Sequence, residues 1–193
     1  MEIDSYQTEL TDYIIELEDV LSPEVCKEII KEYENSKKWR SGLIGLKGEM
    51  DKNTRNCEVI PISNANVINE NTERRKELDS QIFEAVSKCL KFYNGMFWNL
   101  QVKKDTGYDL LRYGEGGFYV EHIDHFPEIQ RTLTMSLILN DDYEGGEFSF
   151  FNKEYLIKPQ AGQAIIFPSN FMFPHGVMPV KGGRRYAVVT WFL

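Results

Sequence analysis

The first half of the chain contains two stretches in which apolar residues recur at the spacing of an α-helix. Ser22-Pro23-Glu24 opens the first with a hydroxyl cap, a proline at the first helical position and a carboxylate near the positive end of the helix dipole. The pattern predicts a helix from about Pro23 to Asn35. A second start signal lies at Asn71-Thr72-Glu73, followed by apolar positions at helical spacing: Leu78, Ile82, Val86, Leu90 and Tyr93.

The segment between these helices, Ser41 to Asn71, shows little periodicity and is punctuated by Gly and Asn. We expect a short strand at Cys57–Ile60 and loop elsewhere.

From Asp109 onward, short segments rich in aromatic and β-branched residues alternate with Gly, Pro, Asn and Asp, which is typical of strands joined by tight turns. The pattern predicts an α+β protein, mainly β, in which N-terminal helices pack on one sheet of a jelly roll or barrel. The expected strands are Asp109–Tyr113, Phe118–Ile123, Leu133–Asn140, Glu147–Phe151, Glu154–Lys158, Gln163–Phe167, Gly176–Val180 and Arg185–Phe192.

Composition narrows the possible functions. The formal charge of −8 argues against nucleic acid or an anionic membrane as a partner, because both require a basic surface. The N-terminus has neither a basic start nor an apolar run, and no apolar stretch approaches membrane-spanning length, so we expect a cytoplasmic protein. The three cysteines match no metal or redox spacing and are expected to be passive thiols.

The chain has three histidines, which makes the search for a metal site short. His122 and Asp124 are two residues apart and would project from the same face of a strand, with Ile123 directed into a core. With His175, they would form the two-histidine, one-carboxylate triad that suits iron(II) and leaves further positions open. His125 has the opposite parity and is expected to be a loop histidine. From these residues alone a polar turn, or a zinc hydrolase that uses the same three ligands, stays open.

The residues that follow strengthen the iron interpretation. Glu144–Glu147, Pro159–Ala164 leading into Ile165–Phe167, His175 and Arg185–Phe192 occur in this order. Together with His122-x-Asp124 they resemble the iron(II)- and 2-oxoglutarate-dependent dioxygenases, in particular the prolyl 4-hydroxylase-like branch. The resemblance implies one domain with a double-stranded β-helix core, also called jelly-roll or cupin-like, at about residues 106–193 and helical support at about 1–105.

The resemblance also implies roles for single residues. His122, Asp124 and His175 match the iron ligands, and Arg185 matches the basic residue that holds the distal carboxylate of 2-oxoglutarate. Tyr113 resembles a tyrosine that adds a hydroxyl to that carboxylate.

Strand parity adds one more candidate. It places Arg185, Ala187, Val189 and Trp191 on one face, so Trp191 is expected to line the cosubstrate pocket. Arg184 points the other way and is the alternative anchor.

The implied activity is hydroxylation of an unactivated carbon, coupled to decarboxylation of 2-oxoglutarate to succinate and CO2. It requires Fe(II) and O2, with ascorbate expected as reductant. We expect the substrate to be a prolyl residue in a peptide or protein, with Gly114–Gly117 or Asn53–Asn71 as a lid. A free amino acid or other small molecule as substrate and a non-catalytic metal-binding jelly roll are the alternatives.

Overall fold

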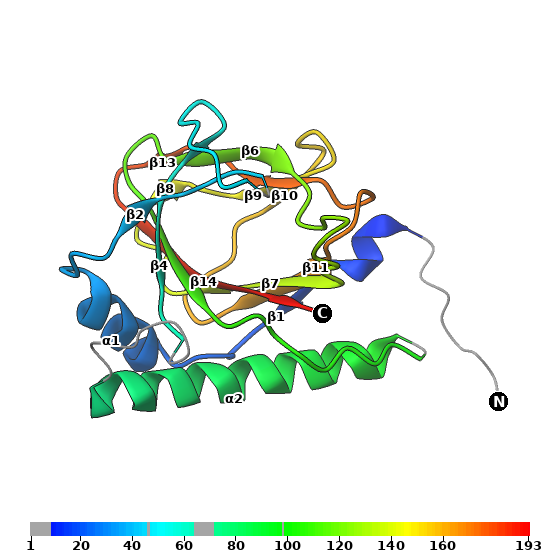
Figure 1. The fold of residues 1–193 in the computed structure, drawn as a ribbon, viewed down its shortest axis with the longest axis horizontal. Coiled ribbons are helices and arrows are strands. Elements are labelled where there is room, and N and C mark those ends of the chain that lie inside the picture. Colours follow the sequence, from blue (N-terminus) through cyan, green and yellow to red (C-terminus); the bar gives the residue numbers. More distant parts are fainter. Residues whose placement is uncertain (1–8, 46, 64–71, 98) are drawn as a thin grey trace.

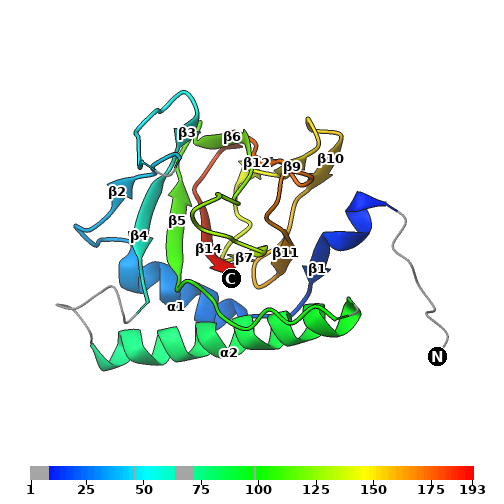
Figure 2. The same ribbon diagram turned by 45° about the vertical axis from the view of Figure 1, so that its right-hand side comes forward.

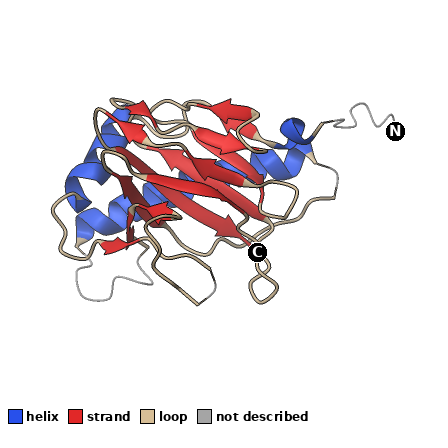
Figure 3. Cartoon of the chain, turned by 90° about the horizontal axis from the view of Figure 1, so that it is seen from above, coloured by secondary structure: helices blue, strands red, loops and turns tan. Residues whose placement is uncertain are grey.

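Two antiparallel sheets face each other, and two helices cover the outer face of the larger sheet (Figures 1 and 2). The computed structural model describes residues 9–45, 47–63, 72–97 and 99–193. The helices are α1 (Pro23–Tyr33) and α2 (Glu73–Met96), and the 3-10 turn η1 (Leu10–Tyr13) precedes the first strand. Seen from above, the helices are partly hidden behind the strands (Figure 3).

The larger sheet has the strand order β1-β11-β7-β14-β5-β4-β2. Its strands are β1 (Ile15–Leu17), β11 (Ala164–Pro168), β7 (Leu133–Ile138), β14 (Arg185–Phe192), β5 (Asp109–Tyr113), β4 (Glu58–Pro61) and β2 (Arg40–Ser41). The smaller sheet has the order β10-β9-β12-β6-β3. Its strands are β10 (Tyr155–Ile157), β9 (Phe148–Phe150), β12 (His175–Val177), β6 (Phe118–His122) and β3 (Arg55–Asn56), and a short pair joins β8 (Glu144–Gly145) to β13 (Val180–Lys181).

Both helices begin where the sequence predicts. The Ser22 hydroxyl accepts a hydrogen bond from the Val25 amide, and the Thr72 hydroxyl accepts one from the Arg75 amide. Their apolar stripes form one core with the larger sheet. Ile29 of α1 and Ile82 of α2 are almost completely buried in it.

Strand alternation gives the larger sheet two different faces. Leu133, Met135 and Leu137 of β7 belong to the core under the helices, whereas Thr134 and Ser136 line a cavity between the sheets. In the same way, Arg185 and Trp191 of β14 face this cavity. The long central strand β14 pairs with β5 on one side and with β7 on the other, so it places its side chains in register with theirs.

The expected fold class is confirmed, and β5 and β14 have the predicted bounds. The expectation that the first half is mainly helical support was incomplete. Its short strands β1, β2 and β4 extend the larger sheet and β3 extends the smaller one. The predicted second-helix signal at Asn71 and part of the expected lid lie outside the described residues. Among the described residues, neither helix combines the length and apolar character needed to cross a membrane.

Candidate metal centre

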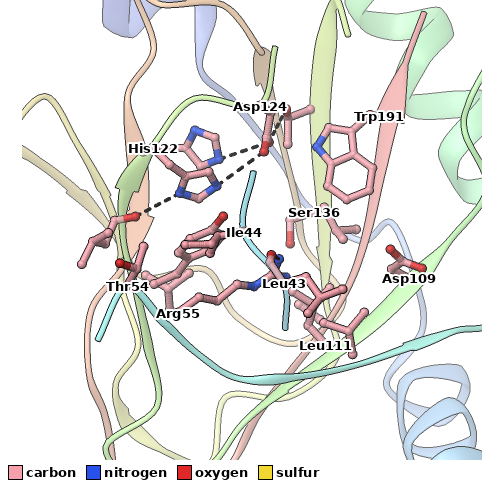
Figure 4. Close-up of a pocket in the computed structure, with 18 of the residues that line it drawn as sticks. Leu43, Ile44, Thr54, Arg55, Asp109, Leu111, His122, Asp124, Ser136 and Trp191 are labelled. Atoms are coloured by element: carbon pink, nitrogen blue, oxygen red, sulfur yellow. Dashed lines mark hydrogen bonds and ion pairs between the residues drawn. The ribbon is translucent and has the colours of Figure 1, made fainter. Parts of the chain in front are cut away.

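His122, Asp124 and His175 come together at the junction of β6 and β12. His122 ends β6, His175 begins β12, and the two are opposite each other in the antiparallel pair. One Asp124 oxygen lies 3.4 Å from Nε2 of His122 and the other lies 3.3 Å from Nε2 of His175 (Figure 4). One potential ligand atom from each side chain lies within 4.8 Å of the other two. Within the described ranges, this is the one group of its kind.

Backbone carbonyls orient both imidazoles. Nδ1 of His122 lies 3.0 Å from the carbonyl oxygen of Val120, and Nδ1 of His175 lies 3.2 Å from that of Phe173. Each Nδ1 is therefore placed to donate a hydrogen bond to a carbonyl, which leaves Nε2 as the ring atom that faces Asp124. Burial, together with the neighbouring His175, lowers the pKa of His122, so its neutral form is favoured.

The carboxylate of Asp124 is buried and has its own support. Burial alone would raise the pKa of Asp124, but His175 and His122 outweigh this effect and hold it well below the usual value. The Thr134 hydroxyl donates to Oδ2 of Asp124 at 2.8 Å, and the Ser169 hydroxyl lies 2.8 Å from that of Thr134. Because the Thr134 proton is committed to Asp124, Ser169 is the donor of the second bond. Both hydroxyl residues are fully buried.

These three side chains fit iron(II). Two neutral imidazole nitrogens and one ionised carboxylate form the donor set of a facial triad, and the carbonyl and hydroxyl bonds are the outer contacts that such ligands need. The cavity lies on the open side of the triad, with a volume of about 620 Å³.

Arg185 lies deeper in the same cavity. It is 1% exposed, and its Nε and Nη2 atoms have no hydrogen-bond partner among the described residues. The rings of Phe148 and Tyr113 lie 4.9 and 5.4 Å from the guanidinium carbon, and Tyr113 is the cross-strand neighbour of Arg185. A buried guanidinium with unused donors is a ready site for an anion. Burial also raises the pKa of Tyr113, so its hydroxyl keeps the proton that it can donate.

Gly146 makes room for this arginine. Its φ of +66° lies in the left-handed region, and a Cβ atom here would lie 2.7 Å from the Tyr143 ring and 3.1 Å from Cδ of Arg185. Any side chain at position 146 would therefore crowd Tyr143 and Arg185, which explains the second glycine of Gly145-Gly146.

The comparisons with known proteins agree with this geometry. Residues 108–193 match the model of the 2OG-Fe(II) oxygenase superfamily. This part of the chain belongs to that superfamily. The name of the superfamily includes iron(II) and 2-oxoglutarate, and the His122, Asp124 and His175 group suits the metal.

Similar proteins carry prolyl hydroxylase names. A segment of 67 residues is 43% identical to human prolyl 3-hydroxylase 2; it covers 32% of this chain and 10% of the human protein. A putative prolyl 4-hydroxylase of Acanthamoeba polyphaga mimivirus is 28% identical over 91% of this chain and 72% of its own length. A Trichoplax adhaerens prolyl hydroxylase, solved with a hypoxia inducible factor peptide, has a TM-score of 0.79 at 21% identity and covers 95% of this chain and 84% of its own. The last similarity shows the fold.

The other predicted residues of this oxygenase domain are also placed by the structure. Trp191 lines the cavity, as strand parity predicts, and the Arg131 guanidinium stacks on it at 3.8 Å. Arg184 points away and pairs with Glu34 at 2.6 Å. Nδ1 of His125 lies 3.0 Å from the Arg131 carbonyl oxygen, and His125 is not part of the metal-ligand group.

One local expectation was wrong. Ile123 is 37% exposed and lines the cavity instead of entering a core, because β6 ends at His122 and strand alternation stops there. The lid at Gly114–Gly117 or Asn53–Asn71 stays a prediction. Leu43, Ile44 and Gly45, in the segment from β2 to β3, line the cavity and precede the expected lid at Asn53–Asn71. From that range, Thr54, Arg55, Val59 and Pro61 also line it.

Several contact residues were not singled out from the sequence. The Tyr119 ring stacks on the His122 ring, with the two ring centroids 3.6 Å apart. The guanidinium carbon of Arg55 lies 4.6 Å from the centroid of the same Tyr119 ring. Thr134 supports Asp124. For Thr134 a signal existed: in Leu133–Ile138 the polar residues Thr134 and Ser136 are two apart in an apolar strand, which indicates a polar cavity on one face.

Proposed function

We propose that this chain is an iron(II)- and 2-oxoglutarate-dependent hydroxylase in which His122, Asp124 and His175 hold the metal. The observation that carries the proposal is the pairing of this triad with Arg185, a buried arginine with unused donors in the same cavity. When bound, iron(II) would supply the redox chemistry that divides dioxygen between 2-oxoglutarate, giving succinate and CO2, and a substrate C–H bond, giving C–OH. A non-catalytic metal module or a zinc hydrolase has no need for such an arginine.

Each residue then has a defined task. Arg185 binds the distal carboxylate of 2-oxoglutarate through two parallel N–H donors, and Tyr113 adds its hydroxyl. Gly146 leaves the space in which the arginine lies. Thr134 and Ser169 keep the Asp124 carboxylate turned toward the histidines. Trp191 closes the cavity wall with Arg131, which limits the access of water to the reacting atoms.

We propose a prolyl residue in a peptide or protein as the substrate. The support is the set of prolyl hydroxylase names among the similar proteins and the mainly apolar cavity wall beside the triad. A proline ring fits such a wall, which includes Leu43, Ile44, Val59, Leu111 and Val189. Ascorbate as a reductant and a cytoplasmic location stay predictions.

The test is a reconstitution with iron(II), 2-oxoglutarate and proline-containing peptides in air. We expect succinate formation that depends on added iron, together with peptides that gain one oxygen on a prolyl ring by mass spectrometry. Succinate formation without any oxidised peptide would contradict the proposed prolyl substrate but not the proposed reaction class. No iron-dependent succinate with any substrate tested, from a protein that binds iron, would contradict the reaction class. Omitting ascorbate in a parallel assay tests its role.

A further inference from the structure

Asp109 is an ionisable group of the cavity that the proposed metal and cosubstrate sites do not use. It begins β5, and its side chain faces the cavity together with Leu111 and Tyr113, whereas Leu110 between them faces the helix-side core. In Figure 4 it lies on the side of the cavity away from His122, beyond Trp191 and near Leu111.

The sheet register places Asp109 within reach of a bound substrate. Asp109 is opposite Val189 of β14, and Val189 is opposite Ser136 of β7. Two strand spacings separate Asp109 from Ser136, which is roughly 10 Å between the outer Cα atoms. Thr134, which bonds to Asp124, is the next residue along β7 on the same face. The Cα atoms of Asp109 and Thr134 are therefore about 12 Å apart on one cavity wall, a distance that a short peptide segment spans.

The carboxylate of Asp109 has no partner in the part of the chain that the structure describes, neither a hydrogen bond nor an ion pair. Burial raises the pKa of Asp109, and the positive charges of Arg55 and Arg131 counteract this shift without forming an ion pair with it. Asp109 is half-buried in the cavity wall, and a carboxylate there that lacks a protein donor points to a ligand that supplies one.

Unused donors lie on the neighbouring wall. Nε1 of Trp191 and Nε of Arg131 are buried and have no hydrogen-bond partner among the described residues, and both residues line the cavity. The indole nitrogen of Trp191 is on the edge of the ring nearer Asp124 (Figure 4). One unused acceptor and two unused donors between apolar walls complement a ligand that carries both an N–H group and a carbonyl or carboxylate oxygen.

We propose that Asp109 is a specificity-determining residue that accepts a hydrogen bond from an N–H group of the substrate. The inference rests on the proposed hydroxylase function, because it assigns the substrate end of the same cavity. A prolyl nitrogen inside a peptide has no hydrogen, so in a peptide the donor is the amide N–H of the residue that follows. In free proline the donor is the ring ammonium. The peptide amide and the ring ammonium of free proline would donate the same hydrogen bond to Asp109. Only the ammonium is charged, so the effect of neutralising Asp109 distinguishes the two kinds of substrate.

The experiment uses the full chain loaded with manganese(II) and 2-oxoglutarate under nitrogen, so that binding is measured without turnover. Calorimetric titrations compare N-acetyl-proline N-methylamide, which has one N–H, with N-acetyl-proline N,N-dimethylamide, which has none, and with free L-proline. The variants are Asp109→Leu and Asp109→Asn. Glu58→Leu is the matched control, because Glu58 lies on the adjacent strand β4, on the opposite face, where it pairs with Arg112.

We expect the unsubstituted protein to bind the N-methylamide at least about tenfold more tightly than the dimethylamide, because a hydrogen bond to a charged group is lost in the second. Asp109→Leu should bring the two affinities within about twofold, and Glu58→Leu should preserve the preference. Asp109→Asn should keep most of the preference if the source is a peptide amide. A preference for free proline that Asp109→Asn abolishes identifies an ammonium as the source.

Three outcomes would overturn the inference. The first is equal affinity of the unsubstituted protein for the two amides, and the second is a preference that survives Asp109→Leu. The third is that no proline probe binds to protein that holds manganese and 2-oxoglutarate. This result would contradict the proposed prolyl substrate but not the proposed cofactor sites. Failure of manganese and 2-oxoglutarate to bind is a separate result, which overturns the proposed function together with the inference.

Discussion

The two faces of the larger sheet use the same strands for different purposes. On the helix side, β7 presents Leu133, Met135 and Leu137 to an apolar core with α1 and α2. On the cavity side, the alternate residues Thr134 and Ser136 are polar and line the candidate metal centre. One strand therefore contributes to stability with one set of residues and to chemistry with the residues between them.

This comparison separates two kinds of substitution. Loss of an apolar side chain on the helix side leaves a void in a packed core and lowers the free energy of unfolding. Loss of a polar side chain on the cavity side is expected to weaken binding of the proposed metal, cosubstrate or substrate. Measurements of stability and of binding on the same variants therefore test whether the two faces are independent.

The largest effect is expected from Asp124→Ala. The substitution removes the carboxylate that lies between the two imidazoles, so iron-dependent turnover should fall to the background level. The protein should stay folded by circular dichroism, because the triad lies outside the helix-side core. Glu154→Ala, at an exposed position, is the control. Full activity of Asp124→Ala would remove Asp124 from the proposed site.

Arg185→Gln should weaken 2-oxoglutarate binding by roughly 30-fold or more, since it removes the buried charge that pairs with the distal carboxylate in the proposed function. Arg184→Gln should change it by less than about threefold, because Arg184 is more than half exposed and pairs with Glu34 away from the cavity. Calorimetric titration of 2-oxoglutarate into the manganese-loaded variants measures both. The reverse order would assign the anchor to Arg184.

Leu137→Ala tests the helix-side face. Leu137 is 1% exposed, so its truncation should lower the free energy of unfolding by about 2–5 kcal/mol, measured by denaturant titration. Metal affinity measured under native conditions should stay the same. A large loss of metal affinity at full folding would show that the two faces are coupled through β7.

A smaller effect is expected at Thr134, one strand position from the helix-side residues. Thr134→Val keeps the shape and removes the hydroxyl that donates to Asp124, so metal affinity should fall by about tenfold. Thr134→Ser restores the donor and should recover most of the affinity. An unchanged dissociation constant for manganese in Thr134→Val would mean that the hydroxyl does not position the carboxylate.

Much of the fold was predictable because the longer elements have strong periodicity. The caps at Ser22 and Thr72 and the alternation in β5 and β14 mark their elements clearly. The strands β2 and β3 were missed because each has two residues, which is too short for a period to be visible. Their pairing is decided by neighbours far away in the sequence.

The site was predictable to the extent that it follows sequence spacing. His122, Asp124, His175 and Arg185 occur in a recognisable order, and the structure brings their side chains to one cavity. The contacts of Thr134 with Asp124 and of Arg131 with Trp191 join segments that only the folded sheets bring together. Asp109 gave no local signal either, because an acidic residue at the start of a strand is usually exposed.

The central claim is that one iron ion is bound by two imidazole nitrogens and one carboxylate. Anomalous diffraction at the iron absorption edge, from crystals grown with iron(II) and 2-oxoglutarate without oxygen, tests it directly. We expect one strong peak between Nε2 of His122, Nε2 of His175 and the nearest Asp124 oxygen, within bonding distance of all three atoms. A peak elsewhere, or these three side chains turned away from the ion, would contradict the account.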